Sequence, residues 1–195
     1  FILVSKILSN FDLFYKKTYN KLKKSSSLVI MIIKISKILK LKIIHPSPFK
    51  DKRGIYFESY NKKKYQKKLK VNFVEDDFSI NKKNVFKGIH GDNKTWKLVS
   101  CIHGKIDAFI VNCEKKSKNF GKWEKFELSS NKYRQILIPP NFGNSFYVKS
   151  DFAIYHYKQS KYYEGKKKQF TYKWHDPLIN LKLEKKKIII SKRDG

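Results

Sequence analysis

Short runs of alternating apolar and polar residues recur along the chain from about residue 31 onward. A period of two is typical of β-strands that bury one face, and the strand-favouring residues Ile, Val, Tyr and Phe supply most of the apolar positions. The Lys-rich stretch 61–70 is predicted to form a short surface helix. The predicted strands are Ile32–Ile44, Arg53–Glu58, Val71–Asp76, Val85–His90, Lys97–Ile102, Ile106–Cys113, Trp123–Leu128, Gln135–Ile138, Ser145–Val148 and Ala153–Tyr157.

The spacing of these strands predicts an all-β fold. Many short strands separated by turns are typical of sandwiches and barrels, including the jelly roll. His103-Gly104-Lys105 lies between two of the strands and predicts a tight hairpin, because glycine readily supplies the turn. No internal repeat or inter-domain linker interrupts the pattern, so we expect one domain, with or without a tail.

The first 30 residues stand apart from this pattern, because they mix Lys with apolar residues and carry no clear helix start or stop signals. The only methionine, Met31, follows them. We therefore expect the domain to span 31–195 and interpret 1–30 as an extension, a neighbour's remnant or read-through. A basic amphipathic helix on a membrane surface is the alternative. No membrane span is expected, because the apolar run Leu28–Ile33 is far shorter than the roughly 20 residues that a bilayer requires.

The formal net charge of +29 invites a nucleic-acid interpretation. However, only three of the 45 basic residues are arginine, and the lysines are scattered along the whole chain. Specific readers of nucleic acid use the bidentate arginine fork heavily, and no recognition motif is present. We expect no specific nucleic-acid partner. The two cysteines, Cys101 and Cys113, lie in apolar stretches without a disulfide pattern, which favours a reducing cytoplasm.

One segment carries candidate chemistry: a predicted strand ends in Gly88-Ile89-His90-Gly91-Asp92, and Lys97 follows on the next strand. The two side chains could converge in one cavity, although a lone strand histidine is more often structural. The other four histidines fit no metal-ligand spacing. A metal-dependent enzyme would need several His and carboxylate ligands around one ion, so we expect no metal.

Several short motifs follow one another in a fixed order. They are DKRGIYFESYN (51–61), NVFKGIH (84–90), KLV (97–99), FGKW (120–123), IPPNFG (138–143), Tyr157-Lys158, Tyr162-Tyr163, WHDP (174–177) and ISKRD (190–194). On these motifs, from about Ile43 to Asp194, the chain resembles the dTDP-4-dehydrorhamnose 3,5-epimerase family, whose fold is a cupin-type jelly roll (a double-stranded β-helix), with short peripheral helices. Within the family, His-Gly-Asp after Gly-Ile and the later Pro-Pro-Asn-x-Gly-Asn-Ser look closest to the epimerases of GDP-6-deoxy-4-keto-heptose.

The resemblance implies a role for each matching residue. His90 matches the base that removes a proton from a carbon next to a ketone, which suits an imidazole with a reference pKa of about 6.5. Asp194 matches the carboxylate that orients this base, Lys97 the cation near the ketone oxygen, and Tyr157 the acid on the opposite face of the sugar. The implied substrate-binding positions are Arg53, Glu58, Lys87, Asn144 and Arg193.

The resemblance therefore implies a nucleotide-sugar epimerase that inverts C3, C5 or both in a dTDP- or GDP-linked 4-keto-6-deoxy sugar. It implies a homodimer, no cofactor and a role in surface-polysaccharide synthesis. A one-step register error would move the acid role from Tyr157 to a neighbour. The family continues beyond Asp194, so we expect a truncated C-terminus that holds this carboxylate less firmly. A sugar-nucleotide 3,4-ketoisomerase and a noncatalytic sugar-binding cupin are the alternatives.

Three departures from the family pattern bear on the substrate. Lys87 stands where the family usually has arginine, which loses bidentate phosphate geometry. Asn144 replaces a second active-site histidine. Glu75-Asp76-Asp77 replaces Gln-Asp-Asn and puts negative charge near a dianionic ligand. We interpret these changes as an altered substrate, since the catalytic residues remain.

Overall fold

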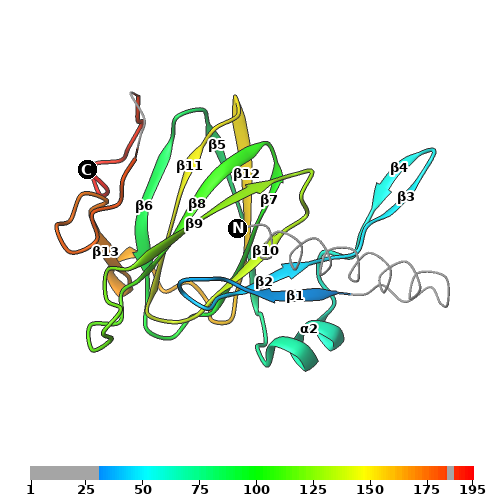
Figure 1. Ribbon diagram of the computed structural model, residues 1–195, viewed down its shortest axis with the longest axis horizontal. Coiled ribbons are helices and arrows are strands. Elements are labelled where there is room, and N and C mark those ends of the chain that lie inside the picture. Colours follow the sequence, from blue (N-terminus) through cyan, green and yellow to red (C-terminus); the bar gives the residue numbers. More distant parts are fainter. Residues whose placement is uncertain (1–30, 184–186) are drawn as a thin grey trace, which may run out of the picture. The chain divides into compact units, whose positions relative to one another are not determined.

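Two antiparallel β-sheets face one another in the computed structural model, which describes residues 31–183 and 187–195 (Figure 1). Met31–Gly195 forms one compact unit. The six-stranded sheet has the order β1 (Ile32–Ile35), β2 (Lys42–His45), β10 (Gln135–Ile138), β7 (Lys97–His103), β12 (Phe152–Gln159) and β5 (Glu75–Lys82). The five-stranded sheet has the order β13 (Phe170–Tyr172), β6 (Phe86–Gly91), β11 (Phe142–Val148), β8 (Lys105–Asn112) and β9 (Trp123–Ser129).

Successive strands mostly alternate between the two sheets. The chain passes from β5 in one sheet to β6 in the other, back to β7, and across again to β8. The main apolar core fills the space between the sheets and includes Val99, Ile110, Ile136 and Tyr155, each at most 1% exposed. This arrangement confirms the predicted all-β, cupin-type jelly roll.

The predicted hairpin at His103-Gly104-Lys105 is wrong. The turn is present, and Gly104 has a φ of 76° and leaves no room for a Cβ against the Phe152 carbonyl. However, β7 pairs with β10 and β12, whereas β8 pairs with β11 and β9. The glycine therefore redirects the chain from one sheet to the other.

Two other predicted strands have different bounds. The segment Ile32–Ile44 is not one strand but the antiparallel pair β1 and β2, with Lys40 in a left-handed conformation between them. The predicted strand Val71–Asp76 starts too early, because β5 runs from Glu75 to Lys82. Val71 is buried instead in the cluster beneath the helix. The short strand β13 and the hairpin partner β3 (Phe49–Asp51) of β4 (Gly54–Tyr56) were not anticipated.

The predicted surface helix is confirmed as α2 (Lys62–Leu69). Asn61 caps its N-terminus by accepting a hydrogen bond from the Lys64 N–H at 3.1 Å. Lys70 ends it in the left-handed conformation. Tyr65 and Leu69, four residues apart, are both buried against the six-stranded sheet, so one apolar face holds an otherwise Lys-covered helix in place. Within the described residues, a short 3₁₀ turn, Lys166–Lys168, adds a second peripheral helix.

The interpretation of 1–30 as an extension or a membrane-surface helix lies outside the described residues. Within the described part of the chain, no helix has both the length and the apolar character needed to cross a membrane.

Candidate active site

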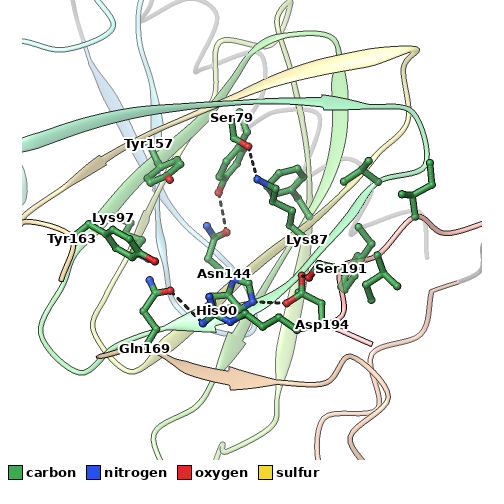
Figure 2. Close-up of a pocket in the computed structure, with 18 of the residues that line it drawn as sticks. Ser79, Lys87, His90, Lys97, Asn144, Tyr157, Tyr163, Gln169, Ser191 and Asp194 are labelled. Atoms are coloured by element: carbon green, nitrogen blue, oxygen red, sulfur yellow. Dashed lines mark hydrogen bonds and ion pairs between the residues drawn. The ribbon is translucent and has the colours of Figure 1, made fainter. Parts of the chain in front are cut away.

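A cavity of about 590 Å³ lies between the two sheets, along β6 and β11 on one side and beside the start of β7 and the second half of β12 on the other (Figure 2). Seven of the nine predicted site residues line it: His90, Lys97, Tyr157, Asp194, Lys87, Asn144 and Arg193. The remaining lining residues are Ser79, Val85, Phe86, Gly88, Phe146, Tyr155, Gln159, Tyr163, Gln169, Ile189, Ile190 and Ser191.

His90 and Asp194 form a hydrogen-bonded pair at one wall of the cavity. His90 lies near the end of β6, and its Nε2 is 2.6 Å from Asp194 Oδ1. Asp194 is only 3% exposed, and its other oxygen accepts a hydrogen bond from the Ser191 hydroxyl at 2.9 Å. The expectation of a loosely held carboxylate is therefore not met. An ionised carboxylate accepts the Nε2 proton, which leaves the lone pair of Nδ1 as the basic site of the neutral ring.

The surroundings keep the ring neutral and the carboxylate charged. Burial lowers the pKa of His90, Asp194 partly offsets this effect, and the nearby cations Arg193 and Lys97 lower the pKa further. Burial opposes ionisation of Asp194, but the Gly88 N–H, the His90 ring and the Ser191 hydroxyl hold its pKa below the ordinary value. The pair is therefore organised as a neutral base beside a permanent anion.

The other predicted catalytic groups come from the opposite sheet. Lys97 begins β7 and is 7% exposed, and burial lowers the pKa of its ammonium group. Tyr157 lies on β12, where burial, with the Asp77 and Glu75 carboxylates, raises the pKa of its phenol to about 12. The phenol thus stays protonated at neutral pH and can serve as an acid, and a lysine on the same cavity wall suits an oxyanion that develops there.

The register of β12 decides which of the residues around Tyr157 face the cavity. Tyr155 and Tyr157 both line it, as expected for positions two apart. His156 points to the other face of the sheet, where its Nε2 lies 2.5 Å from Asp76 and its Nδ1 lies 3.2 Å from Ser100 Oγ. Since Tyr155 is fully buried, Tyr157 is the tyrosine of this strand that reaches open space.

Arg53 and Glu58 do not join the cavity. Arg53 lies in the turn of the β3–β4 hairpin, with its side chain 81% exposed and paired with Asp51 at 2.6 Å. Glu58 pairs with Lys64 at the start of α2, at 3.0 Å. Figure 1 shows this hairpin extending away from both sheets. These two predicted substrate positions are therefore not assembled with the others in one chain.

The acidic residues of β5 divide between two faces. Glu75 and Asp77 lie on the cavity-facing side, opposite Gln159 and Tyr157, and accept hydrogen bonds from the Gln159 amide at 2.6 and 3.0 Å. Asp76 lies on the opposite face with His156 and Lys158. Asp76 is therefore paired with protein donors away from the cavity, whereas the Glu75 and Asp77 charges act on Tyr157 and Lys97 in the cavity wall.

Sequence reasoning missed four residues that support the site. Arg193 is held by Thr171 Oγ1 at 2.7 Å and Gln169 Oε1 at 3.4 Å. Ser191 holds Asp194, and Tyr155 donates to Asn144. Only Tyr155 had a signal in the sequence, since it lies two residues from Tyr157 on one strand. Among the described residues, no three His, Cys, Asp or Glu side chains are grouped to hold a metal ion.

Fold and site together define a jelly-roll protein whose inter-sheet cavity is lined by a His–Asp pair, a lysine and a tyrosine. The family model for dTDP-4-dehydrorhamnose 3,5-epimerase matches residues 36–195, and the chain belongs to this family. The Salmonella typhimurium enzyme of that name is 36% identical over 157 residues, covering 78% of this chain and 85% of its own. The dTDP-6-deoxy-D-glucose-3,5-epimerase from Legionella pneumophila, solved in complex with dTDP-4-keto-L-rhamnose, has a TM-score of 0.79 at 33% identity and covers 85% of this chain and 90% of its own.

Proposed function

We propose that this enzyme inverts C3, C5 or both carbons of a nucleotide-linked 4-keto-6-deoxy sugar, with dTDP as the nucleotide and GDP as the alternative. The observation that carries this proposal is the pair formed by His90 of β6 and Asp194, which packs on β6, facing a cavity that Lys97 and Tyr157 reach from the other sheet. The relatives described above are named as epimerases of dTDP-linked sugars, which is why dTDP is preferred.

In the proposed reaction, His90 Nδ1 takes the proton from the carbon beside the C4 ketone. The electron pair of the broken C–H bond forms a double bond between that carbon and C4 of the sugar, and the ketone oxygen becomes an enolate oxygen. Lys97 stabilises that negative charge. Tyr157 then donates its proton to the same carbon from the opposite face, which inverts the configuration, and both groups return to their starting forms by exchange with water. No cofactor is required, because no electrons enter or leave the substrate.

The remaining predicted residues are proposed to bind the substrate. Lys87, whose Nζ lies 2.7 Å from Ser79 Oγ, and Arg193 add positive charge to the cavity wall and suit a diphosphate. Asn144 adds an amide beside His90.

Arg53 and Glu58 are proposed to act on the cavity of a second copy, in a homodimer. The β3–β4 hairpin that carries Arg53 extends away from both sheets and exposes the apolar residues Phe49, Ile55 and Tyr56, which are 61, 48 and 68% exposed. Glu58 follows this hairpin and pairs with Lys64 of α2. Exposed apolar side chains beside an exposed arginine suit an arm that packs on another subunit.

The pathway and compartment are also proposals. A 4-keto-6-deoxy sugar linked to a nucleotide serves as a precursor for surface polysaccharide, including lipopolysaccharide, made from cytoplasmic donors. Both cysteines are free and buried, which suits the reducing cytoplasm.

The test is deuterium incorporation followed by NMR, with dTDP- and GDP-linked 4-keto-6-deoxy sugars in heavy water. We expect exchange at C3 or C5 with the wild type, loss of exchange in His90→Asn, and wild-type behaviour in His175→Asn. His175 is an exposed histidine outside the cavity and serves as the matched control. A folded wild type that binds these sugars without exchange would indicate a binding cupin, and migration of the ketone to C3 would indicate a ketoisomerase.

A further inference from the structure

One hydrogen bond crosses the interior at the floor of the cavity and links the two sheets. The Tyr155 hydroxyl, on β12, donates to Asn144 Oδ1, on β11, at 2.8 Å (Figure 2). Tyr155 is 0% exposed, and its ring stacks on Phe146 with centroids 4.4 Å apart. A hydroxyl buried this deeply needs a partner, so the bond holds Asn144 strongly in place.

This bond fixes which end of the Asn144 amide faces the cavity. Oδ1 is occupied by Tyr155, and the Nδ2 group has no protein acceptor among the described residues. Asn144 lines the cavity, and it lies directly opposite His90 in the β11–β6 ladder. A fixed donor pair of N–H groups is thus presented beside the proposed base.

We propose that Asn144 Nδ2 donates a hydrogen bond to the C4 ketone oxygen as it becomes an enolate, and that Tyr155 is the positioning residue that holds Asn144 in this orientation. The inference rests on the proposed epimerase function. C4 is bonded to both C3 and C5, so its oxygen remains close to the base whichever carbon is deprotonated. A donor anchored next to His90 is well placed to reach that oxygen.

The Asn144 amide and the Lys97 ammonium group would both stabilise the oxyanion. Asn144 comes from the five-stranded sheet and Lys97 from the six-stranded sheet, so the two donors approach from different walls. Preorganised donors of this kind are effective because they need no rearrangement when charge develops. The alternative partner for Asn144 is the diphosphate or the nucleotide, and kinetics separates the two, because only a contact made in the transition state lowers kcat.

The experiment compares Asn144→Asp, Tyr155→Phe and the double variant in steady-state kinetics. Asn144→Asp keeps an oxygen for the Tyr155 hydroxyl but removes the donor. We expect kcat to fall about 10²- to 10³-fold, with KM changed less than about threefold. Tyr155→Phe keeps the ring and its stacking on Phe146, so we expect a smaller loss of kcat, on the order of tenfold, at unchanged KM.

The double variant tests whether Tyr155 acts through Asn144. If it does, Tyr155→Phe lowers kcat no further in the Asn144→Asp background. Tyr147→Phe is the matched control, because the Tyr147 hydroxyl donates to Asn84 Oδ1 at 2.5 Å outside the cavity; we expect it to keep wild-type kcat. Thermal unfolding confirms that each variant is folded.

A rise in KM at unchanged kcat in Asn144→Asp would overturn the inference in favour of a nucleotide or diphosphate contact. Additive losses in the double variant would overturn the positioning role of Tyr155. The wild type and His90→Asn separate these results from a failure of the proposed function: an active wild type with unaffected Asn144 and Tyr155 variants contradicts this inference alone, whereas an inactive wild type contradicts the function.

Discussion

His90 is subject to opposing influences that decide when it can act as a base. Burial and the neighbouring cations favour the neutral ring, whereas Asp194 favours the charged ring. The first influence keeps the base free of a proton at neutral pH, and the second stabilises the imidazolium that forms when a proton is taken from carbon. Both are needed, because a ring that never accepted a proton could not catalyse exchange.

This balance predicts a change in pH dependence for Asp194→Asn. Activity requires neutral His90, so the acid limb of kcat/KM in the wild type should lie below the ordinary histidine pKa of 6.5. The Asp194 charge raises the pKa of His90, so its removal lowers that pKa and should move the limb to still lower pH. The plateau should fall by about 10²-fold or more.

The measurement is a kcat/KM profile of both enzymes across the acid range. Asp151→Asn is the control, because the Asp151 side chain is 92% exposed and pairs with Lys83 away from the cavity. We expect its profile to match the wild type. An acid limb that moves to higher pH in Asp194→Asn would contradict the electrostatic role.

At the residue scale, the sequence motifs were sufficient to predict most of the charged and polar residues that line the cavity. His90 and Lys97 lie on successive strands, Tyr157 and Asp194 lie much further along the chain, and all four line one cavity. The supporting partners could not be anticipated in the same way. That Tyr155 meets Asn144 depends on the packing of two different sheets, which no local pattern encodes.

At the element scale, the last residues of the chain are held against β6. Ile189 forms a parallel bridge with Val85, and its carbonyl accepts the Phe86 N–H at 2.9 Å. Asp194 then packs directly on Gly88, where an added Cβ would lie 2.7 Å from the carboxylate carbon. The glycine two residues before His90 therefore makes room for the carboxylate that orients the histidine.

We predict that Gly88→Ala disrupts this arrangement without straining the backbone, since Gly88 is not among the glycines with positive φ. The new methyl group should displace Asp194 and lower kcat by about 10²-fold, as for Asp194→Asn. Deuterium exchange rates measure the loss. Gly195→Ala, next to Asp194 and with no atom closer than 3.7 Å to its added Cβ, should stay within about twofold of the wild type. Equal activity of Gly88→Ala and Gly195→Ala would refute the packing argument.

The elements themselves were predictable where the signal is local. Helix α2 combines a capping Asn61 with buried residues four apart, and both signals lie within ten residues. The turn at Gly104 was also predictable, but the partners of β7 and β8 were not, because a glycine turn serves equally between paired strands and between sheets. Strand β5 was placed too early, because its outward residues Phe78 and Ile80 are 61 and 72% exposed and give no clear burial pattern.

At the scale of the whole molecule, one chain leaves the proposed site incomplete. The cavity holds the proposed base, the carboxylate paired with it and the proposed acid, whereas Arg53 and Glu58 lie on parts of the chain outside it. If each subunit of a homodimer supplies this arm to its partner, every working site takes residues from two chains. Isologous pairing would complete both sites at once.

This arrangement predicts complementation between two inactive variants. Arg53→Ala damages the cavity of the partner, and His90→Asn damages the cavity of its own chain. A mixed dimer then has one cavity with both lesions and one with none, because the His90→Asn chain supplies an intact Arg53 to the intact His90 of the other chain. Random pairing makes half of the dimers mixed, so co-expression should restore about a quarter of the wild-type activity.

Co-expressing His90→Asn with Lys97→Met is the control, because both lesions fall in the chain's own cavity and no intact site can form. Activity from the first pair and none from the second requires that Arg53 act in the partner's cavity, whereas no activity from either pair would restrict Arg53 to its own chain.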